Sequence, residues 1–427
     1  MGNKLCCGGE RPETDEFDDV VTSPPSKNTN DPKRKRASIT SVPGAQTDAS
    51  DEQETGHKGS VSSPPGGNNS ALNYSYECAV MPGFDPEDEE ESKECQDSGL
   101  ILETLASMEN MALAAVFDGH GQNGRKASQW VRTHLPKFVH KQITAGATYE
   151  AALAYGCCEA EKGLMKQSFN VKLSGTTATI CLLEANKLHC SWVGDSRAVM
   201  AQRTSEGKLE VVDLSIDHKP EDPEERKRIE RKGGIVKIVP GDDTETYRVF
   251  DKIAVEMGQW RPGLAMARSV GDTSATDIGC IPVPTYAVFD LTPKDEFVII
   301  ASDGLWEVFT SQQSIEWAED YMKSHREADD ELPGHGKNPK YLTCSEAMAQ
   351  EAQKRWVVVY NKEIMVDDCT VLFCWLDKNT SAEEGAEGPT TPKKKNVRRA
   401  TVMIDQSDMD HAARVARVNK KIADEAK

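Results

Sequence analysis

The sequence predicts a layered α+β domain between about Lys93 and Leu376. Short runs in this region alternate small or polar residues with apolar ones and are separated by turns, which is typical of strands. Longer stretches with helical spacing lie between these runs. The strands and helices fall into separate blocks, and Thr176–Gln202 indicates successive antiparallel strands with tight connections. We therefore do not expect an alternating parallel sheet.

The individual elements follow from the same two periodicities. The predicted strands are Ala112–Phe117, Thr176–Leu183, Leu188–Val193, Arg197–Gln202, Glu296–Ala301 and Thr370–Trp375. The predicted helices are Arg125–Val139, Tyr149–Gln167, Pro223–Lys232, Ser311–Ser324 and Cys344–Val357.

The segments on either side of this region have a different composition. Residues 1–75 are poor in apolar residues and rich in Ser, Pro, Gly and Asn, so we expect them to be disordered. The folded domain is predicted to span residues 76–378. Residues 379–427 are predicted as a linker followed by a charged helix, because apolar residues recur at helical spacing in Ser407–Lys427. This helix would dock on the domain or bind a partner.

The charge balance limits the class of partner. The chain has 427 residues with 51 Lys and Arg against 70 Asp and Glu, a formal net charge of −19. Nucleic acid is not an expected partner, because its phosphates would repel such a surface. Clustered carboxylates also repel one another unless a cation neutralises them. The 12 cysteines show no paired zinc-binding spacing, and no apolar run is long enough to span a membrane, so we expect an intracellular protein.

Four acidic sites lie at the ends of predicted strands. Asp118 and Asp303 each follow a strand and precede a glycine, Asp195 follows Gly194, and Asp367 opens the last strand. A carboxylate at a strand end is held by a rigid element, and an adjacent glycine lets backbone oxygens approach the same point. Hard cations such as Mg²⁺ and Mn²⁺ prefer oxygen ligands. One such turn is weak evidence, whereas four in one domain predict a divalent-cation site.

The order and spacing of these motifs resemble the metal-dependent, type-2C protein serine/threonine phosphatase family over residues 93–376. The matching strings are Cys95-Gln96-Asp97, VFDGHG at 116–121, SGTTATICLL at 174–183, VGDSR at 193–197, DHKP at 217–220, ERKRIERKGG at 225–234, LAMARSVGD at 264–272, ASDGLWEV at 301–308 and DDCTVLF at 367–373.

This resemblance implies a four-layer α-β-β-α sandwich, with two central antiparallel sheets flanked by helices and two Mg²⁺ or Mn²⁺ ions at one end. Asp118 would bridge both ions, and the Gly119 carbonyl would bind one of them. Asp303 and Asp367 would bind the other ion. The remaining acidic positions are Asp97, which would act beside the centre through water, and Asp195, which would bind a weaker third ion. At that third site Glu307 replaces the family's aspartate.

The implied reaction is phosphate-ester hydrolysis by water. Two neighbouring cations would lower the pKa of a water and aim it at phosphorus for in-line displacement. They would also neutralise charge on the phosphoryl oxygens. His120 is the natural general acid for the leaving Ser or Thr oxygen, because an imidazole can donate a proton near neutral pH. No phosphoenzyme is expected. The substrates would be phosphoproteins, and the chain would act as a monomer.

One position departs from the family pattern. Many members have an arginine just before the first acidic motif that grips the substrate phosphate, and this chain has none there. Lys93 would substitute for it, but as a point charge without a bidentate fork. Gln96 stands where some members have a glutamate.

Two other readings are open at this stage. Cys190 followed by Arg197 resembles a cysteine-phosphatase loop, although its spacing is one residue too long and Cys190 lies in a predicted strand. The missing arginine would also fit an acylated pseudophosphatase that binds phosphoproteins without turnover.

The N-terminus carries lipidation signals. Gly2 follows Met1 as N-myristoylation requires, although Cys6 stands where Ser or Thr is usual. Cys6 and Cys7 would take palmitate, and a second acyl chain would make the anchor stable on the cytoplasmic face of a membrane.

Two short basic segments resemble kinase substrates. Their acceptors are Ser38 in Lys35-Arg36-Ala37-Ser38 and Thr401 in Arg398-Arg399-Ala400-Thr401. A kinase could reach both in segments predicted to be disordered.

Overall fold

The computed structural model describes residues 73–377, apart from 87–92, 106–107, 109, 185, 241–244, 327–341 and 361–364. The predicted lipidation sites Gly2, Cys6 and Cys7 and the predicted phosphosites Ser38 and Thr401 lie outside the described residues, as does the predicted C-terminal helix.

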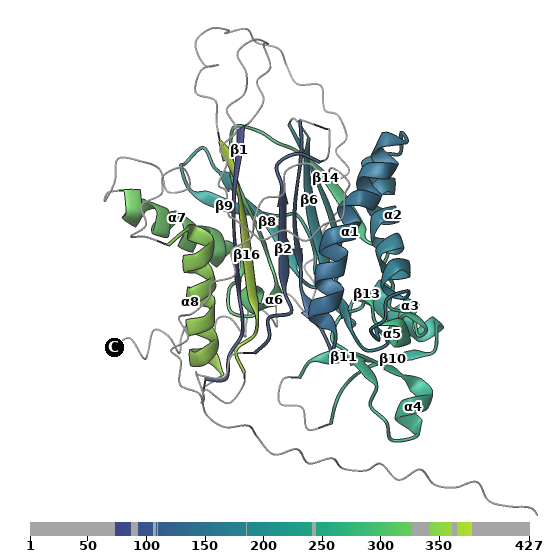
Figure 1. Cartoon of the computed structure of the whole chain (residues 1–427). Coiled ribbons are helices and arrows are strands. Elements are labelled where there is room, and N and C mark those ends of the chain that lie inside the picture. Colours follow the sequence, from purple (N-terminus) through teal and green to yellow (C-terminus); the bar gives the residue numbers. More distant parts are fainter. Residues whose placement is uncertain are drawn as a thin grey trace, which may run out of the picture. The chain divides into compact units, whose positions relative to one another are not determined.

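Two five-stranded antiparallel sheets form the centre of the domain (Figure 1). The first has the order β1 (Asn73–Met81), β16 (Cys369–Asp377), β15 (Asp295–Ala301), β8 (Arg197–Arg203) and β9 (Leu209–Asp213). The second has the order β14 (Thr285–Asp290), β7 (Lys187–Val193), β6 (Ala178–Glu184), β3 (Met111–Phe117) and β2 (Ser98–Leu102).

The two sheets pack face to face through alternate residues of their strands. In β3, Ala112, Ala114 and Val116 join an apolar cluster with residues of the opposite sheet such as Val298 and Leu372. The intervening β3 residues point to the other face and contact the helices there. All seven residues of β3 are buried, because the strand is covered on both faces.

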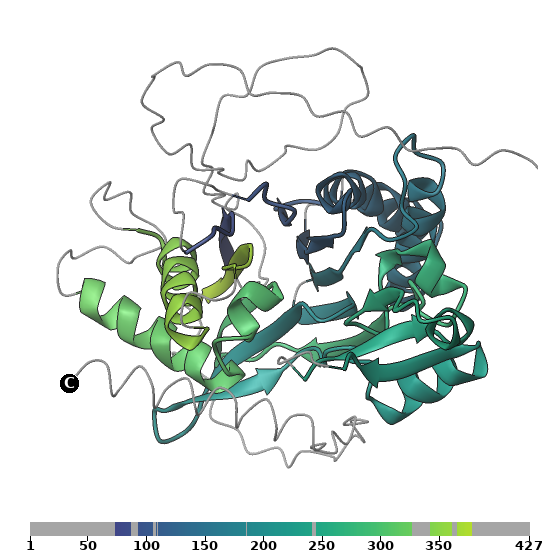
Figure 2. The ribbon, with the colours of Figure 1, turned by 90° about the horizontal axis from the view of Figure 1, so that it is seen from below.

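Helices cover the outer face of each sheet (Figure 2). α1 (Gly124–Thr144) and α2 (Tyr149–Leu164) pack on the second sheet, whereas α7 (Ser311–Arg326) and α8 (Cys344–Val359) pack on the first. Thr343 begins α8 with a reciprocal capping box to Glu346, which satisfies backbone N–H groups that a helix start leaves free. The predicted α-β-β-α sandwich is therefore confirmed.

Smaller elements surround the end of the sandwich where the aspartates lie. α3 (Pro223–Arg231) and α4 (Lys252–Glu256) accompany a three-stranded sheet of β10 (Gly234–Ile238), β11 (Tyr247–Asp251) and β12 (Pro262–Leu264). A second small sheet has the order β13 (Val270–Gly271), β5 (Gly175–Thr176) and β4 (Gly119–His120). Two short helices, α5 (Thr273–Thr276) and α6 (Asp303–Trp306), complete this region.

The six predicted strands and five predicted helices are present with modest shifts at their ends, and two details were wrong. The predicted strand Thr176–Leu183 is interrupted, because the Thr177 N–H bonds to the carbonyl of Asp118 and separates β5 from β6. The segment predicted to be disordered, residues 1–75, was placed three residues too far along the chain at its end, because Asn73–Ser75 belong to β1 and pair with β16. Among the described residues, no helix is long and apolar enough to cross a membrane.

Candidate metal centre

The predicted metal ligands gather at one end of the two central sheets. In the first sheet Ala301 pairs with both Val371 and Arg197, so the end of β15 lies beside the starts of β16 and β8. This pairing brings Asp303, Asp367 and Asp195 to the same edge. In the second sheet Phe117 pairs with Ser98, which places Asp118 and Asp97 together. The strand topology therefore brings together five aspartates that are distant in sequence.

Asp97 links the two sheets. The residue is 6% exposed, and its Oδ2 accepts hydrogen bonds from the hydroxyls of Ser302 and Thr370, each at 2.8 Å. Its Oδ1 is buried and has no hydrogen-bond partner among the described residues. One oxygen of Asp97 is thus fixed by the first sheet, while the other remains available for a further ligand.

Asp367 and Asp368 have different environments although they are adjacent. Asp368 is buried and accepts from the backbone N–H groups of Gly83 and Gln96, so it holds the polypeptide beside the site. Asp367 is only half-buried, and its Oδ1 lies 2.9 Å from the Lys93 ammonium. The structure therefore places Lys93 directly at a candidate metal ligand.

Gly119 occupies a position that no larger residue can take without backbone movement. A Cβ built there would lie 2.5 Å from the carbonyl oxygens of Gln96 and Gly124. Gln96 also donates from its side-chain amide to the carbonyl of Gly121. This close backbone packing holds the turn that presents Asp118 and His120.

His120 contacts an acidic residue that the sequence interpretation missed. Its Nε2 donates to Oδ2 of Asp272 at 2.5 Å. Burial lowers the pKa of His120, but the Asp272 carboxylate outweighs this effect and raises the pKa above its ordinary value. The imidazole is therefore held in its protonated form more firmly than a free histidine. Asp272 closes the LAMARSVGD string, but no local feature of that string signals its contact with His120.

Asp195 is also held by an unpredicted partner. It is 3% exposed, and Lys219 lies 2.7 Å from its Oδ2. Burial lowers the pKa of Lys219, but Asp195 and Asp217 outweigh it and raise the pKa. The signal was present in the DHKP string, which contains Lys219. Because Lys219 supplies a positive charge, the candidate third site around Asp195 is already partly neutralised.

The electrostatics of the cluster favour a bound cation. Burial, followed by the charges of neighbouring aspartates, raises the pKa of Asp118 and of Asp303 well above the ordinary range. The same effects raise the pKa of Asp97 to about 7. Carboxylates that raise one another's pKa in this way release the repulsion when a cation binds between them.

The donor set fits a hard cation that keeps part of its water shell. No three His, Cys, Asp or Glu side chains in the described part of the chain converge closely enough to enclose an ion by themselves. Mg²⁺ is usually bound by one or two carboxylates together with waters, and does not need an all-protein cage. The arrangement of two or three half-buried aspartates beside a backbone carbonyl is of this kind.

The cysteine-phosphatase reading is excluded by the fold. Cys190 is fully buried in β7, and burial together with Cys181 raises the pKa of its thiol well above the usual range. Arg197 belongs to the other sheet and makes two hydrogen bonds to the carboxylate of Asp217. Neither a thiolate nor a free guanidinium is therefore available for phosphate chemistry here.

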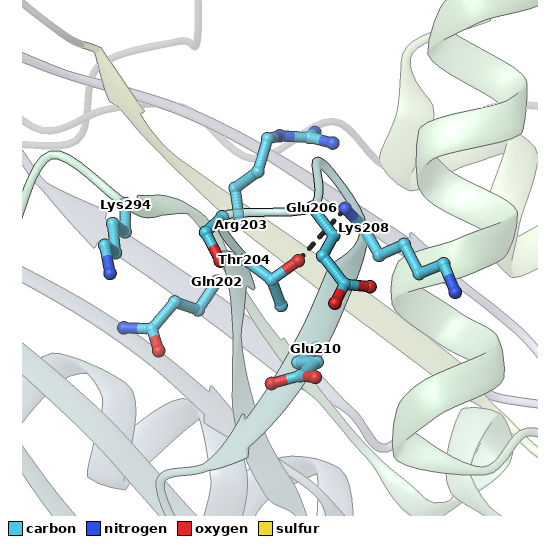
Figure 3. Close-up of a pocket in the computed structure, with 8 residues that line it drawn as sticks. Gln202, Arg203, Thr204, Glu206, Lys208, Glu210 and Lys294 are labelled. Carbon is cyan, nitrogen blue, oxygen red and sulfur yellow. Dashed lines mark hydrogen bonds between the residues drawn. The ribbon is translucent and has the colours of Figure 1, made fainter.

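A polar surface depression elsewhere does not belong to this site (Figure 3). It lies at the β8–β9 turn, whereas the aspartates lie at the opposite end of β8. Its lining residues are Gln202, Arg203, Thr204, Ser205, Glu206, Lys208, Glu210 and Lys294. The Arg203 guanidinium is already paired with Glu296 and Glu319, so it is not free to grip a phosphate.

Together, the fold and the aspartate cluster are those expected of a protein that binds divalent cations at one end of an antiparallel sandwich. Comparison with known proteins agrees, since the model of the protein phosphatase 2C family matches residues 85–357. The chain therefore belongs to the protein phosphatase 2C family, which comprises metal-dependent serine/threonine phosphatases.

Similar proteins include a probable protein phosphatase 2C 64 of Oryza sativa subsp. japonica, 32% identical over 293 residues. That match covers 66% of this chain and 62% of the rice protein, so the chain spans less than two thirds of that relative. A probable protein phosphatase 2C 61 of Arabidopsis thaliana is 30% identical, with 65% and 79% coverage. The crystal structure of serine-threonine phosphatase 2C from Toxoplasma gondii superposes with a TM-score of 0.57 at 20% identity, covering 73% of this chain and 96% of that chain. At that identity it supports the fold alone.

Proposed function

We propose that this chain hydrolyses phosphoserine and phosphothreonine in proteins, using divalent cations held by its aspartate cluster. The observation that carries the proposal is the proximity of Asp97, Asp118 and Asp303, whose burial and mutual repulsion favour a bound cation, with the half-buried Asp367 beside them. The family to which the chain belongs supports the same activity.

Asp118, the Gly119 carbonyl, Asp303 and Asp367 would hold two Mg²⁺ or Mn²⁺ ions. Asp97 would accept a hydrogen bond from their water shell through its free Oδ1. When bound, such ions activate a water for attack on phosphorus and neutralise the phosphoryl oxygens. Asp195 would contribute to a weaker third site, where Lys219 already neutralises part of its charge.

The protein side chains supply the remaining chemistry. His120 would give its proton to the Ser or Thr oxygen as the bond from that oxygen to phosphorus breaks. Lys93 would attract the substrate phosphate, but its ammonium is already shared with Asp367, so phosphate and carboxylate would compete for it. We therefore expect weaker phosphate binding than an arginine fork would give.

The rival proposal is a pseudophosphatase that binds phosphoproteins without turnover, and it is motivated only by the missing arginine. The test is phosphate release from a phosphothreonine peptide by the full chain, with Mn²⁺, with Mg²⁺ and with EDTA, and with a phosphotyrosine peptide as the control substrate. Turnover of the phosphothreonine peptide that EDTA abolishes supports the phosphatase. A folded chain that binds Mn²⁺ but releases no phosphate supports the pseudophosphatase.

We further propose that the chain is attached to the cytoplasmic face of a membrane by acyl groups at Gly2, Cys6 and Cys7. The proposal rests on the sequence motif and on the need for two acyl chains in a stable anchor. Metabolic labelling with alkyne analogues of myristate and palmitate tests it. Loss of the myristate label in Gly2→Ala is expected, and an unlabelled wild-type chain would exclude the anchor.

A further inference from the structure

The small sheet beside the metal centre places Asp272 next to His120. β5 is its middle strand, with β4 on one side and β13 on the other. Gly175 pairs with His120 of β4 and with Gly271 of β13, so these three residues lie in one row across the sheet. Asp272 directly follows Gly271. Residues 152 positions apart in the sequence are thereby brought to opposite sides of one strand.

The Asp272 carboxylate is committed to this contact. An aspartate at the start of a helix normally accepts from the helix's own N–H groups. Asp272 precedes α5, yet its side chain makes no such capping bond. Its Oδ2 instead accepts from Nε2 of His120 at 2.5 Å and from the hydroxyl of Ser269 at 2.6 Å. The side chain is 5% exposed, so these partners replace water.

The backbone of Asp272 is in an uncommon conformation. Its φ is 44° and its ψ is 49°, in the left-handed region that non-glycine residues seldom adopt. Strained residues of this kind persist only where the surrounding structure holds them, and they cluster at functional sites. The conformation turns the carboxylate away from α5 and across β5 towards His120.

The contact also depends on a glycine at the centre of the row. A Cβ at Gly175 would lie 2.2 Å from Oδ2 of Asp272 and 2.6 Å from Oγ of Ser269. Any side chain at this position would therefore occupy the space through which Asp272 reaches His120. Gly175 has no positive φ, so its conformation alone does not require glycine.

The contact with Asp272 is the stronger of two interactions that hold the ring, and the other is with the backbone of Asp118. Nδ1 of His120 is buried and has no hydrogen-bond partner among the described residues. The hydrogen bond to Asp272 is therefore the main contact that fixes the rotation of the imidazole. Without it the ring could turn about its side-chain bonds, and its distance from a substrate oxygen would no longer be set.

We propose that Asp272 is the positioning residue for His120 and orients the imidazole for proton transfer to the leaving oxygen. The absence of a side chain at Gly175 leaves the space for this contact. This inference rests on the proposed phosphatase activity. In the assisted step water bonds to phosphorus and gives up one proton to the solvent, and the bond from phosphorus to the Ser or Thr oxygen breaks. The electron pair stays on that oxygen, which takes the proton from the imidazole. Asp272 touches neither the substrate nor the reacting atoms.

Comparing two substrates with different leaving groups distinguishes a positioning role of Asp272 from a merely structural one. A threonine alkoxide is a strong base and needs the proton, whereas p-nitrophenolate is a weak base and leaves without it. Asp272→Ala should lose about 100-fold in kcat on a phosphothreonine peptide but no more than about threefold on p-nitrophenyl phosphate. Asp272→Asn keeps a hydrogen-bond acceptor and tolerates the left-handed backbone, so it should recover part of the peptide rate. Gly175→Ala should reproduce the selective loss, because its Cβ displaces the Asp272 carboxylate while both His120 and Asp272 are kept.

Two controls separate positioning from general damage. Asp295→Asn changes another buried aspartate, at the start of β15, and should affect both substrates equally. The double variant His120→Gln with Asp272→Ala should be no slower than His120→Gln alone, because residues that act as a unit are not additive.

A readout independent of turnover completes the test. The imidazole N–H that donates to Asp272 should give a downfield proton resonance in wild type that is lost in Asp272→Ala. Equal losses on both substrates, additive effects in the double variant, or a resonance that survives in Asp272→Ala would each overturn the role of Asp272. Wild type that hydrolyses neither substrate would instead overturn the proposed phosphatase, and with it this role.

Discussion

Replacing Asp97 with asparagine should stabilise the metal-free protein at neutral pH. Burial first, and the charge of Asp368 second, raise the pKa of Asp97 from its ordinary 3.8 to about 7. A carboxyl whose pKa is raised in the folded state binds its proton more tightly there than in the unfolded chain. Its contribution to stability is therefore greatest below about pH 4 and is lost as the pH rises towards 7.

The size of the effect follows from this shift. At about 1.4 kcal/mol per pKa unit, a rise from 3.8 to about 7 corresponds to at most about 4 kcal/mol. Proton sharing and relaxation among the neighbouring carboxylates reduce this, so we expect Asp97→Asn to gain about 1–2 kcal/mol near neutral pH and almost nothing at about pH 4. The asparagine carbonyl can still accept from Ser302 and Thr370.

Urea unfolding of the full chain in EDTA, at two pH values, measures this difference. Asp295→Asn is the matched control, because Asp295 is also buried but accepts from Gln202 and from the Thr292 N–H, outside the cluster. The control should be destabilised at both pH values. If Asp97→Asn were destabilised to the same extent at both, the repulsion assigned to the cluster would be wrong. Excess Mn²⁺ should remove the advantage of Asp97→Asn.

Three further predictions concern other parts of the domain. Glu225→Gln should cost about 3 kcal/mol of stability, because it breaks a buried ion pair with Arg268. Burial would raise the pKa of Glu225, but Arg268 lowers it to about 2. The stabilisation from this ion pair is therefore present above about pH 4.5 and is lost as the pH falls towards 2. Acid unfolding of wild type and variant measures this loss. Gly119→Ala should abolish Mn²⁺ binding in calorimetry, because its Cβ would lie 2.5 Å from the Gln96 carbonyl; undiminished binding would contradict that packing. Cys190→Ala should keep phosphatase activity while lowering the melting temperature, because the thiol only fills the core; an inactive but folded variant would revive the thiolate chemistry.

The sequence predicted those parts of the site that have a local signal. Asp118 and Asp303 each end an apolar strand before a glycine, and that pattern is visible within a few residues. The central strands were also predictable, because their alternation reflects burial on two faces. The start of β1 was not predictable, because Asn73–Ser75 follow a long polar segment and carry no strand pattern of their own. They form a strand because they pair with β16.

The partners of the site residues could not be predicted, because they are set by tertiary contacts. Asp272 meets His120 across 152 residues, and Ser302 meets Asp97 across 205. Nothing near Lys93 in the sequence indicates that its ammonium contacts Asp367, since that contact joins the two ends of the domain. Spacing along the chain identifies which groups have suitable chemistry, and the sheet order decides which of them meet.

The most direct test of the metal centre is the rate of phosphothreonine-peptide hydrolysis as a function of free Mn²⁺, for wild type and for Asp303→Asn. We predict a saturable rise from no activity in EDTA for the wild type. In the variant we predict a loss of about 100-fold or more, or a curve displaced to much higher Mn²⁺ concentrations. Hydrolysis that persists at full rate in EDTA, or an Asp303→Asn variant with the wild-type Mn²⁺ dependence, would show that these aspartates do not hold the ions that drive the reaction.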